Sequence, residues 1–164
     1  MKNRARILFV TEAALIAALY TVLTVFVGAF GLANGAIQFR VSEALCVLPF
    51  FTPAAIPGLA VGCLIANLLS PFGILDVIFG SLTTLIAAVL TYVCKKRPLL
   101  ALSFPVTLNA LFLPIVWLFA GGESAFFLNV FSIFITQTAF VYGLGYPLFR
   151  ALKKSQKTLS FLQE

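Results

Sequence analysis

Six long apolar segments, separated by short stretches that carry most of the charged residues, make up this chain of 164 residues. Hydrophobic residues account for 62% of the sequence and charged residues for 10%, whereas a soluble domain is about 45–50% apolar and about 25% charged. The mean hydropathy of +1.10 points the same way. This composition excludes a water-soluble globular fold, and we predict an integral membrane protein.

The apolar segments are numerous enough for six membrane crossings. A hydrocarbon core about 30 Å thick is spanned by roughly 20 helical residues, and the chain length suits one domain. No alternation of period two persists, which disfavours a barrel. We therefore predict an all-α fold, a compact six-helix membrane bundle over residues 1–164. The expected helices cover about 7–27, 41–51, 54–69, 75–94, 99–119 and 124–149.

The second and third of these helices differ from the others. The second has about a dozen residues, which make only about 18 Å of α-helix. Pro49, Pro53 and Pro57 lie within or between the two segments, and proline disrupts a helix interior. We expect broken or tilted helices here, a form tolerated at membrane depth where the backbone is buried in protein or lines a cavity.

The basic residues predict the orientation. They flank the expected helices in three groups: Lys2, Arg4 and Arg6; Lys95, Lys96 and Arg97; and Arg150, Lys153, Lys154 and Lys157. With six crossings all three groups fall on one side, which the positive-inside rule identifies as the cytoplasm. Both termini are therefore expected in the cytoplasm and the protein in the cell membrane. Orientation explains the net charge of +6 without a nucleic-acid partner.

Polar side chains within the apolar segments are expected to converge near the outer ends of the helices. Among the eleven basic residues only Arg40 falls on the outer side, three residues before Glu43. Polar groups inside a membrane are costly and usually face a bundle interior or cavity, so we predict an outward-facing pocket for a small molecule. The candidate binding residues are Gln38, Arg40, Glu43, Asn67, Asp76, Asn109, Trp117, Glu123 and Gln137.

Simpler explanations exist for several of these residues. Interhelical hydrogen bonds account for many lone polar side chains in membrane helices. Arg40 and Glu43 could form an interfacial ion pair that anchors a short helix. Small residues also have two interpretations: Ala13 with Ala17, and Ala14 with Ala18, form two small-xxx-small pairs that fit close packing within the chain or against a partner. Packing within the chain is favoured for a similar ridge in the third helix, which includes Gly58 and Gly62.

Several chemistries are excluded. The chain has no histidine, so imidazole-dependent metal sites and general-base catalysis are not expected. Cys46, Cys63 and Cys94 are scattered and form no C-x-x-C motif, and we interpret them as small buried hydrophobic residues. No G-x-x-x-x-G-K-[ST] sequence is present, so ATP is not hydrolysed by a P-loop of this chain. We expect neither an enzyme nor a cofactor, and nearly apolar inner helix halves disfavour a passive channel.

Three segments carry a resemblance to a known family: IQFRVSEAL at 37–45, PAAIPGLAVGCLIAN at 53–67 and DVIFGSLTTLIAA at 76–88. They resemble the substrate-binding S components of energy-coupling factor (ECF) transporters, in particular the QueT family, whose assigned substrates are queuosine precursors. The resemblance implies six helices, both termini inside and an exterior pocket covered by the loop at 28–39. It also implies partners, a transmembrane scaffold subunit with two cytosolic ATPases. The scaffold would dock on Ala13, Ala14, Ala17 and Ala18.

The resemblance further implies a 7-deazaguanine ligand. Its ring N1–H and exocyclic amine are adjacent donors that one carboxylate accepts in parallel, a role we expect for Glu43. Arg40 then either orients Glu43 from the same helix face or contacts the ligand carbonyl. Asp76 or Glu123 would meet the ammonium group of an aminomethyl precursor.

The remaining candidates have supporting roles in this interpretation. Trp117 or one of the many phenylalanines would stack on the flat ring. The ligand carbonyl would accept from Asn67, Asn109, Gln38 or Gln137. The alternative is an S component for another vitamin, such as riboflavin, thiamine or biotin.

Overall fold

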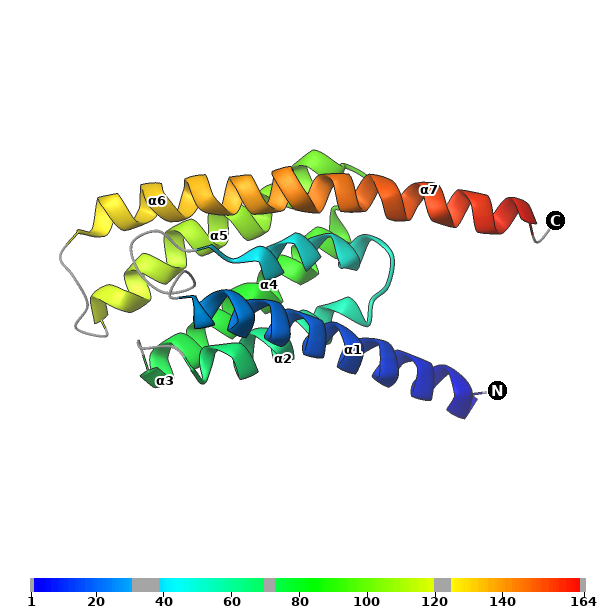
Figure 1. Ribbon diagram of the computed structural model, residues 1–164, viewed down its shortest axis with the longest axis horizontal. Helices are drawn as coiled ribbons and strands as arrows, with labels where there is room; N and C mark the ends of the chain where they lie inside the picture. The colour runs from blue at the N-terminus through cyan, green and yellow to red at the C-terminus, as the bar shows by residue number, and fades with distance from the viewer. Residues whose placement is uncertain (1, 31–38, 70–72, 120–124, 163–164) are drawn as a thin grey trace.

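The computed structural model describes residues 2–30, 39–69, 73–119 and 125–162. Its helices are α1 (Lys2–Ala29), the 3-10 helix η1 (Val41–Phe50), α2 (Ala55–Asn67), α3 (Gly73–Leu75), the π-helix η2 (Asp76–Gly80), α4 (Ser81–Val93), α5 (Pro98–Phe119), α6 (Phe126–Thr138), the π-helix η3 (Ala139–Gly145) and α7 (Tyr146–Leu162). Over these ranges there is no strand, which confirms the predicted all-helical fold. Since α3, η2 and α4 form one continuous helix, as do α6, η3 and α7, the described chain forms six helical rods (Figure 1).

Four of these rods are long and apolar enough to cross a membrane: Asn3–Ala29, Gly73–Val93, Pro98–Phe119 and Phe126–Gln156. The rods formed by η1 and α2 are shorter, as the sequence predicts. The last rod is longer than expected, because the helix continues past residue 149 to Leu162. The apolar sequence ends at Arg150, but the residues that follow form an amphipathic segment that remains helical.

The 3-10 geometry of η1 explains how a short segment reaches through the bundle. A 3-10 helix rises about 2.0 Å per residue, so its ten residues cover about 20 Å. Side chains three residues apart also align in a 3-10 helix. Glu43, Cys46 and Pro49 therefore project from one face of η1.

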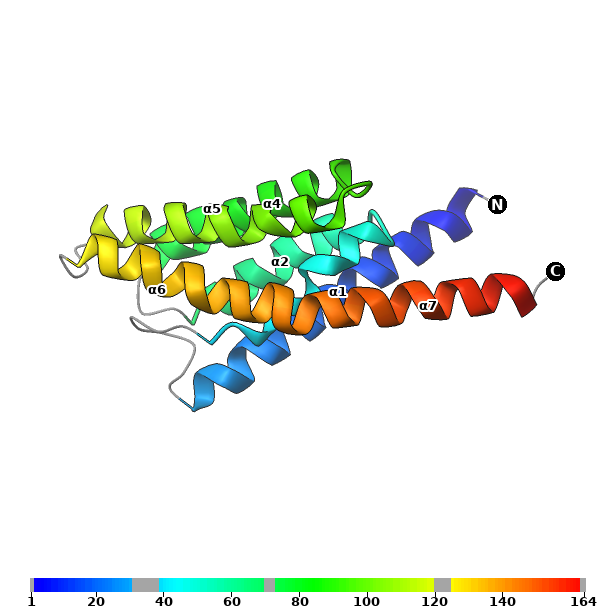
Figure 2. The same ribbon diagram turned by 90° about the horizontal axis from the view of Figure 1, so that it is seen from above.

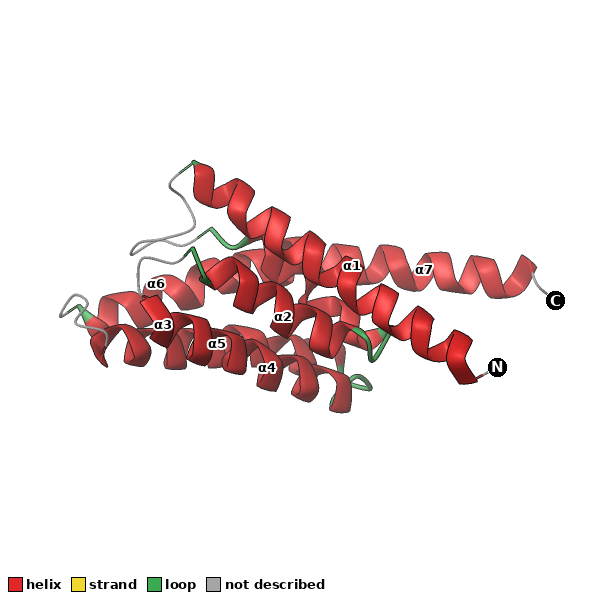
Figure 3. Cartoon of the chain, turned by 90° about the horizontal axis from the view of Figure 1, so that it is seen from below, coloured by secondary structure: helices red, strands yellow, loops and turns green. Residues whose placement is uncertain are grey.

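Helices α1 and α2 approach each other backbone to backbone, and α1 crosses α2 obliquely (Figure 3). A Cβ atom added to Gly58 would lie 2.8 Å from the carbonyl oxygen of Ala13. One added to Gly62 would lie 2.8 Å from the carbonyl oxygen of Ala17. The small ridge of α2 is thus used for packing within the chain, as expected from its spacing.

Among the described residues, three apolar clusters form the core. The first, between α1, α2 and α4, includes Ile16, Leu59 and Ala88. The terminus-side cluster consists of Val47, Leu102, Val106, Val141 and Phe149. The distal cluster consists of Ala110, Leu113, Val116, Trp117 and Ile133.

Both chain termini lie at the same end of the molecule (Figures 1 and 2). The turn that joins α4 to α5 lies in the same half, whereas the C-terminal end of α5 and the N-terminal end of α6 lie at the opposite end (Figure 2). The three basic groups of the sequence therefore occupy one half of the bundle. This is the arrangement that six crossings require, and the side of the membrane that this half faces stays a prediction.

Candidate functional site

Buried polar side chains gather between the apolar clusters, and each of the six helical rods contributes at least one. Together they form what we call the buried polar cluster: Tyr20, Arg40, Glu43, Asn67, Asp76, Asn109 and Gln137. All are at most 6% exposed. Burying a polar group in an apolar bundle costs free energy. The burial of these seven polar side chains near one another therefore needs a common explanation.

Glu43 is at the centre of this cluster and is 1% exposed. Its Oε1 accepts a hydrogen bond of 2.8 Å from the hydroxyl group of Tyr20. Its Oε2 accepts from the Cys46 thiol at 3.2 Å and from Nδ2 of Asn109 at 3.4 Å. The carboxylate that sequence analysis assigned to the ligand thus already accepts donors from α1, η1 and α5.

The carboxylate of Asp76 differs from that of Glu43 in its hydrogen bonding. It is also 1% exposed, but neither of its carboxylate oxygens has a hydrogen-bond partner in the described part of the chain. Its backbone carbonyl accepts a hydrogen bond of 3.1 Å from Nδ2 of Asn67. Asp76 begins the π-helix η2, and single π-turns within α-helices are frequent at functional sites.

Gly80, at the end of η2, leaves room for these side chains. A Cβ atom at this position would lie 2.6 Å from Nδ2 of Asn67 and 3.5 Å from Oδ1 of Asp76. The next neighbour is Cδ2 of Leu113 at 3.7 Å, on α5. Asn109 is four residues before Leu113 and shares its helix face, so Asp76 and Asn109 face the same interface between η2 and α5.

Asn109 and Gln137 lie at one level of the bundle. On α5, Asn109 separates Val106 of the terminus-side cluster from the distal cluster. On α6, Gln137 lies between the distal cluster and Val141 of the terminus-side cluster. Among the described residues, nothing donates to Oδ1 of Asn109 or to Oε1 of Gln137. Two further buried acceptors therefore accompany the carboxylate of Asp76.

Arg40 is the buried cation of the cluster. It directly precedes η1 and is 6% exposed. Its guanidinium group interacts electrostatically with Asp76 and with Glu43. Whether Arg40 orients Glu43 or contacts a ligand stays a prediction.

Three of the predicted binding residues are elsewhere or undescribed. Trp117 is buried in the distal cluster, two helical turns from Asn109 on α5. Gln38 and Glu123 lie outside the described residues. Their roles stay predictions.

The site also contains residues that were not predicted from the sequence. Tyr20 was not singled out, although a tyrosine within an apolar helix needs a partner for its hydroxyl group when buried. The cysteines Cys46 and Cys63 are buried, as expected, but they are also part of the polar network. The Cys63 thiol lies 3.4 Å from Nδ2 of Asn67 and accepts a hydrogen bond of 3.3 Å from the hydroxyl group of Thr84.

The four alanines predicted to dock a partner occupy two faces of α1. Ala17 is buried and Ala13 is half-buried, and both face the glycine ridge of α2. Ala14 and Ala18 are exposed on the outer face. Only the second pair is available to a partner protein in this structure.

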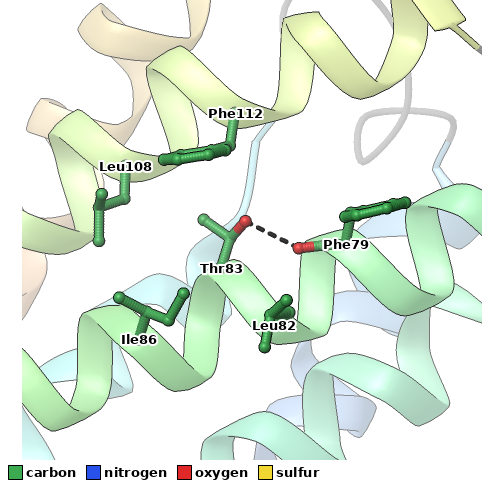
Figure 4. A pocket seen from close by; sticks show the side chains of 6 residues that line it. All are labelled: Phe79, Leu82, Thr83, Ile86, Leu108 and Phe112. Atoms are coloured by element: carbon green, nitrogen blue, oxygen red, sulfur yellow. Dashed lines mark hydrogen bonds between the residues drawn. The ribbon is translucent and has the colours of Figure 1, made fainter.

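A groove between α4 and α5 is a poorer candidate for the binding site (Figure 4). It has a volume of about 170 Å³ and is lined by Phe79, Leu82, Thr83, Ile86, Leu108 and Phe112. Its one hydroxyl group, on Thr83, already donates to the carbonyl oxygen of Phe79 at 2.7 Å (Figure 4). The groove therefore presents no available polar group to orient a heterocycle, unlike the buried polar cluster.

Comparison with known proteins relates the chain to a transporter family. The model of the family described as QueT transporter matches residues 10–154. The queuosine precursor transporter QueT of Lactococcus lactis subsp. cremoris (strain MG1363) is 47% identical over 73 residues, which are 44% of this chain and 43% of that protein. The matched region thus spans less than half the length of that relative. No solved structure matches the chain.

Proposed function

The chain belongs to the QueT transporter family, and on this basis we propose that it is the substrate-binding membrane subunit, the S component, of an ATP-driven ECF importer. In this proposal the protein lies in the cell membrane. Its substrate is a 7-deazaguanine precursor of queuosine, which binds in an outward-facing pocket of the protein. The observation that carries the proposal is the buried polar cluster, in which several acceptor oxygens inside an apolar bundle receive no hydrogen bond from the part of the chain that the structure describes.

The cluster suits a ligand of this chemistry. A 7-deazaguanine presents several N–H donors and one carbonyl acceptor on a flat ring. Asp76, Asn109 and Gln137 offer buried acceptor oxygens that receive no hydrogen bond from the described residues, and Asn67 and Arg40 carry donor groups. The distal cluster beside them supplies apolar surface for the ring and includes Trp117.

Topology supports capture from the outer side. Asn67 ends α2 and Asp76 begins η2, so both lie toward the end of the bundle opposite the termini (Figure 1). The basic groups occupy the other half, which the positive-inside rule would place in the cytoplasm. A ligand entering from the outer side would reach the cluster without crossing the basic half.

The partners follow from the same proposal. Since the sequence has no P-loop, two cytosolic ATPases would supply the energy through a transmembrane scaffold subunit. The exposed pair Ala14 and Ala18 offers a smooth helix face on which a scaffold helix could pack closely. Ala13 and Ala17 would support that face from inside through their contact with α2.

Ligand titration tests the proposal. The purified chain in detergent is titrated with 7-aminomethyl-7-deazaguanine, its 7-cyano analogue, queuine and riboflavin, by calorimetry and by the emission of Trp117, the only tryptophan. We expect saturable binding of a deazaguanine and none of riboflavin. Thr83→Val, in the α4–α5 groove, serves as the control that keeps binding, because the Thr83 hydroxyl group bonds only within its own helix among the described contacts.

Two results would contradict the proposal. Binding of riboflavin, thiamine or biotin without binding of any deazaguanine would support a transporter but reject a deazaguanine as its substrate. Loss of deazaguanine binding in Thr83→Val would indicate that the ligand binds in the α4–α5 groove and not in the buried polar cluster.

A further inference from the structure

The two buried carboxylates of the cluster are not equivalent. Glu43 accepts hydrogen bonds from Tyr20, Cys46 and Asn109. Asp76 accepts none at its side chain from the described residues, although it is equally buried. A buried carboxylate with two bare oxygens is costly. Its retention at this position calls for hydrogen-bond donors that the described residues do not provide.

The charges of the cluster indicate what that partner carries. The buried charged residues in the described part of the chain are Arg40, Glu43 and Asp76. With both acids ionised, two negative charges face one positive charge. An uncompensated charge in an apolar interior is strongly unfavourable, so a cationic ligand would stabilise this site and a neutral ligand would not.

The remaining acceptors indicate the rest of the ligand. Oδ1 of Asn109 and Oε1 of Gln137 lie at one level of the bundle, and neither accepts a hydrogen bond from the described residues. Asp76 faces the same interface as Asn109, beside Gly80, whose missing side chain lets Asn67 and Asp76 approach the helix backbone. The site therefore offers one carboxylate and two amide oxygens to a ligand that is rich in N–H groups.

We propose that Asp76 binds the cationic group of an N–H-rich ligand, while Glu43 holds α1, η1 and α5 together beside it. The inference rests on the proposed function and deepens it. Among 7-deazaguanines, the cation is the ammonium group of the 7-aminomethyl compound. Asp76 is then the residue that selects this precursor over neutral ones of the same size.

The test compares two ligands that differ in charge. Calorimetry measures the affinity of the full chain for 7-aminomethyl-7-deazaguanine and for its neutral 7-hydroxymethyl analogue, which has the same size. We expect the wild-type chain to prefer the aminomethyl compound by about 30-fold or more, since loss of one partner of a buried charge pair typically costs this much. Asp76→Asn should lower its affinity for the aminomethyl compound by roughly 30-fold or more and abolish the preference.

Glu43→Gln is the matched variant, since it neutralises the other carboxylate. It should lower both affinities, together with the melting temperature, and change the ratio between the two ligands less than Asp76→Asn does. Asp76→Glu keeps the charge and should keep the preference. If Asp76→Asn does not fold, as judged by size-exclusion chromatography, the wild-type and Asp76→Glu ratios still decide the question.

Three results would overturn the inference. They are equal binding of the two ligands by the wild-type chain, equal loss of both in Asp76→Asn, and a change of the ratio in Glu43→Gln alone. Failure of the wild-type chain to bind any deazaguanine would instead reject the proposed function, and with it this assignment of the ligand.

Discussion

The hydroxyl group of Tyr20 donates a hydrogen bond of 2.8 Å to Oε1 of Glu43, across 23 residues of sequence. Both side chains are 1% exposed. Because Oε2 of the same carboxylate accepts from Asn109, one side chain connects α1, η1 and α5. The first helix is thus attached to the bundle through a polar contact as well as through its apolar face.

Tyr20→Phe should destabilise the protein. It leaves Oε1 of Glu43 without its donor in a buried site, which typically costs about 1–3 kcal/mol. Thermal unfolding in detergent measures the effect. Tyr142→Phe is the matched control, because Tyr142 also donates one hydrogen bond of 2.8 Å, to Leu99, but at an exposed position. Equal melting temperatures for the two variants would show that the Tyr20–Glu43 bond adds no stability of its own.

Gly62→Ala should separate α1 from α2. The new methyl group would lie 2.8 Å from the carbonyl oxygen of Ala17 and 2.8 Å from Cβ of Tyr20. Overpacking of this kind costs typically about 1–3 kcal/mol, and we expect a lower melting temperature.

Gly143→Ala is the control for this substitution. Within 4 Å of an added Cβ at Gly143 there is no heavy atom of the described chain, so its melting temperature should be unchanged or higher. A Gly62→Ala protein as stable as Gly143→Ala would refute the close approach of the two helices.

Gly80→Ala should weaken ligand binding more than it weakens the fold. The added Cβ would meet Nδ2 of Asn67 at 2.6 Å, and the amide at the end of that side chain can rotate away. This movement would break its bond to the Asp76 carbonyl and fill the space beside the carboxylate. We expect the affinity for a 7-deazaguanine to fall roughly tenfold, equivalent to about 1.4 kcal/mol, by calorimetry. An unchanged affinity would place the ligand away from η2.

Substitutions on α1 should distinguish its two faces. Ala14→Leu and Ala18→Leu place bulk on the exposed face, so the isolated chain should keep its stability and ligand affinity while its co-purification with a co-expressed scaffold subunit falls. Ala17→Leu instead faces the α2 ridge and should lower the melting temperature. Undiminished assembly with both outer variants would remove Ala14 and Ala18 from the proposed interface.

Cys94 offers a test of orientation without engineering. Cys46 and Cys63 are buried, whereas Cys94 is partly exposed beside the basic turn between α4 and α5. A membrane-impermeant maleimide should therefore label the native chain in inverted vesicles and not in intact cells. Cys94→Ser should remove the label. Labelling from the outside of intact cells would reverse the predicted topology.

The sequence by itself determined the class of fold and most of the polar residues of the candidate site. Apolar runs in a membrane must satisfy their own backbone groups, so helices follow from composition and segment length. Costly polar side chains such as Glu43, Asp76 and Asn109 stand out against that background for the same reason. The short second segment was also evident from its length and from Pro49.

Only the tertiary structure decided which polar groups are already paired. Glu43 and Asn109 are 66 residues apart, and their contact depends on how each helix is rotated about its axis. That rotation is set by close packing, as where Gly62 meets Ala17, and no local pattern encodes it. For the same reason the spacing of the alanines on α1 showed two pairs, but packing against α2 decided which pair faces outward. The difference between a satisfied and an unsatisfied carboxylate is therefore a property of the assembled bundle.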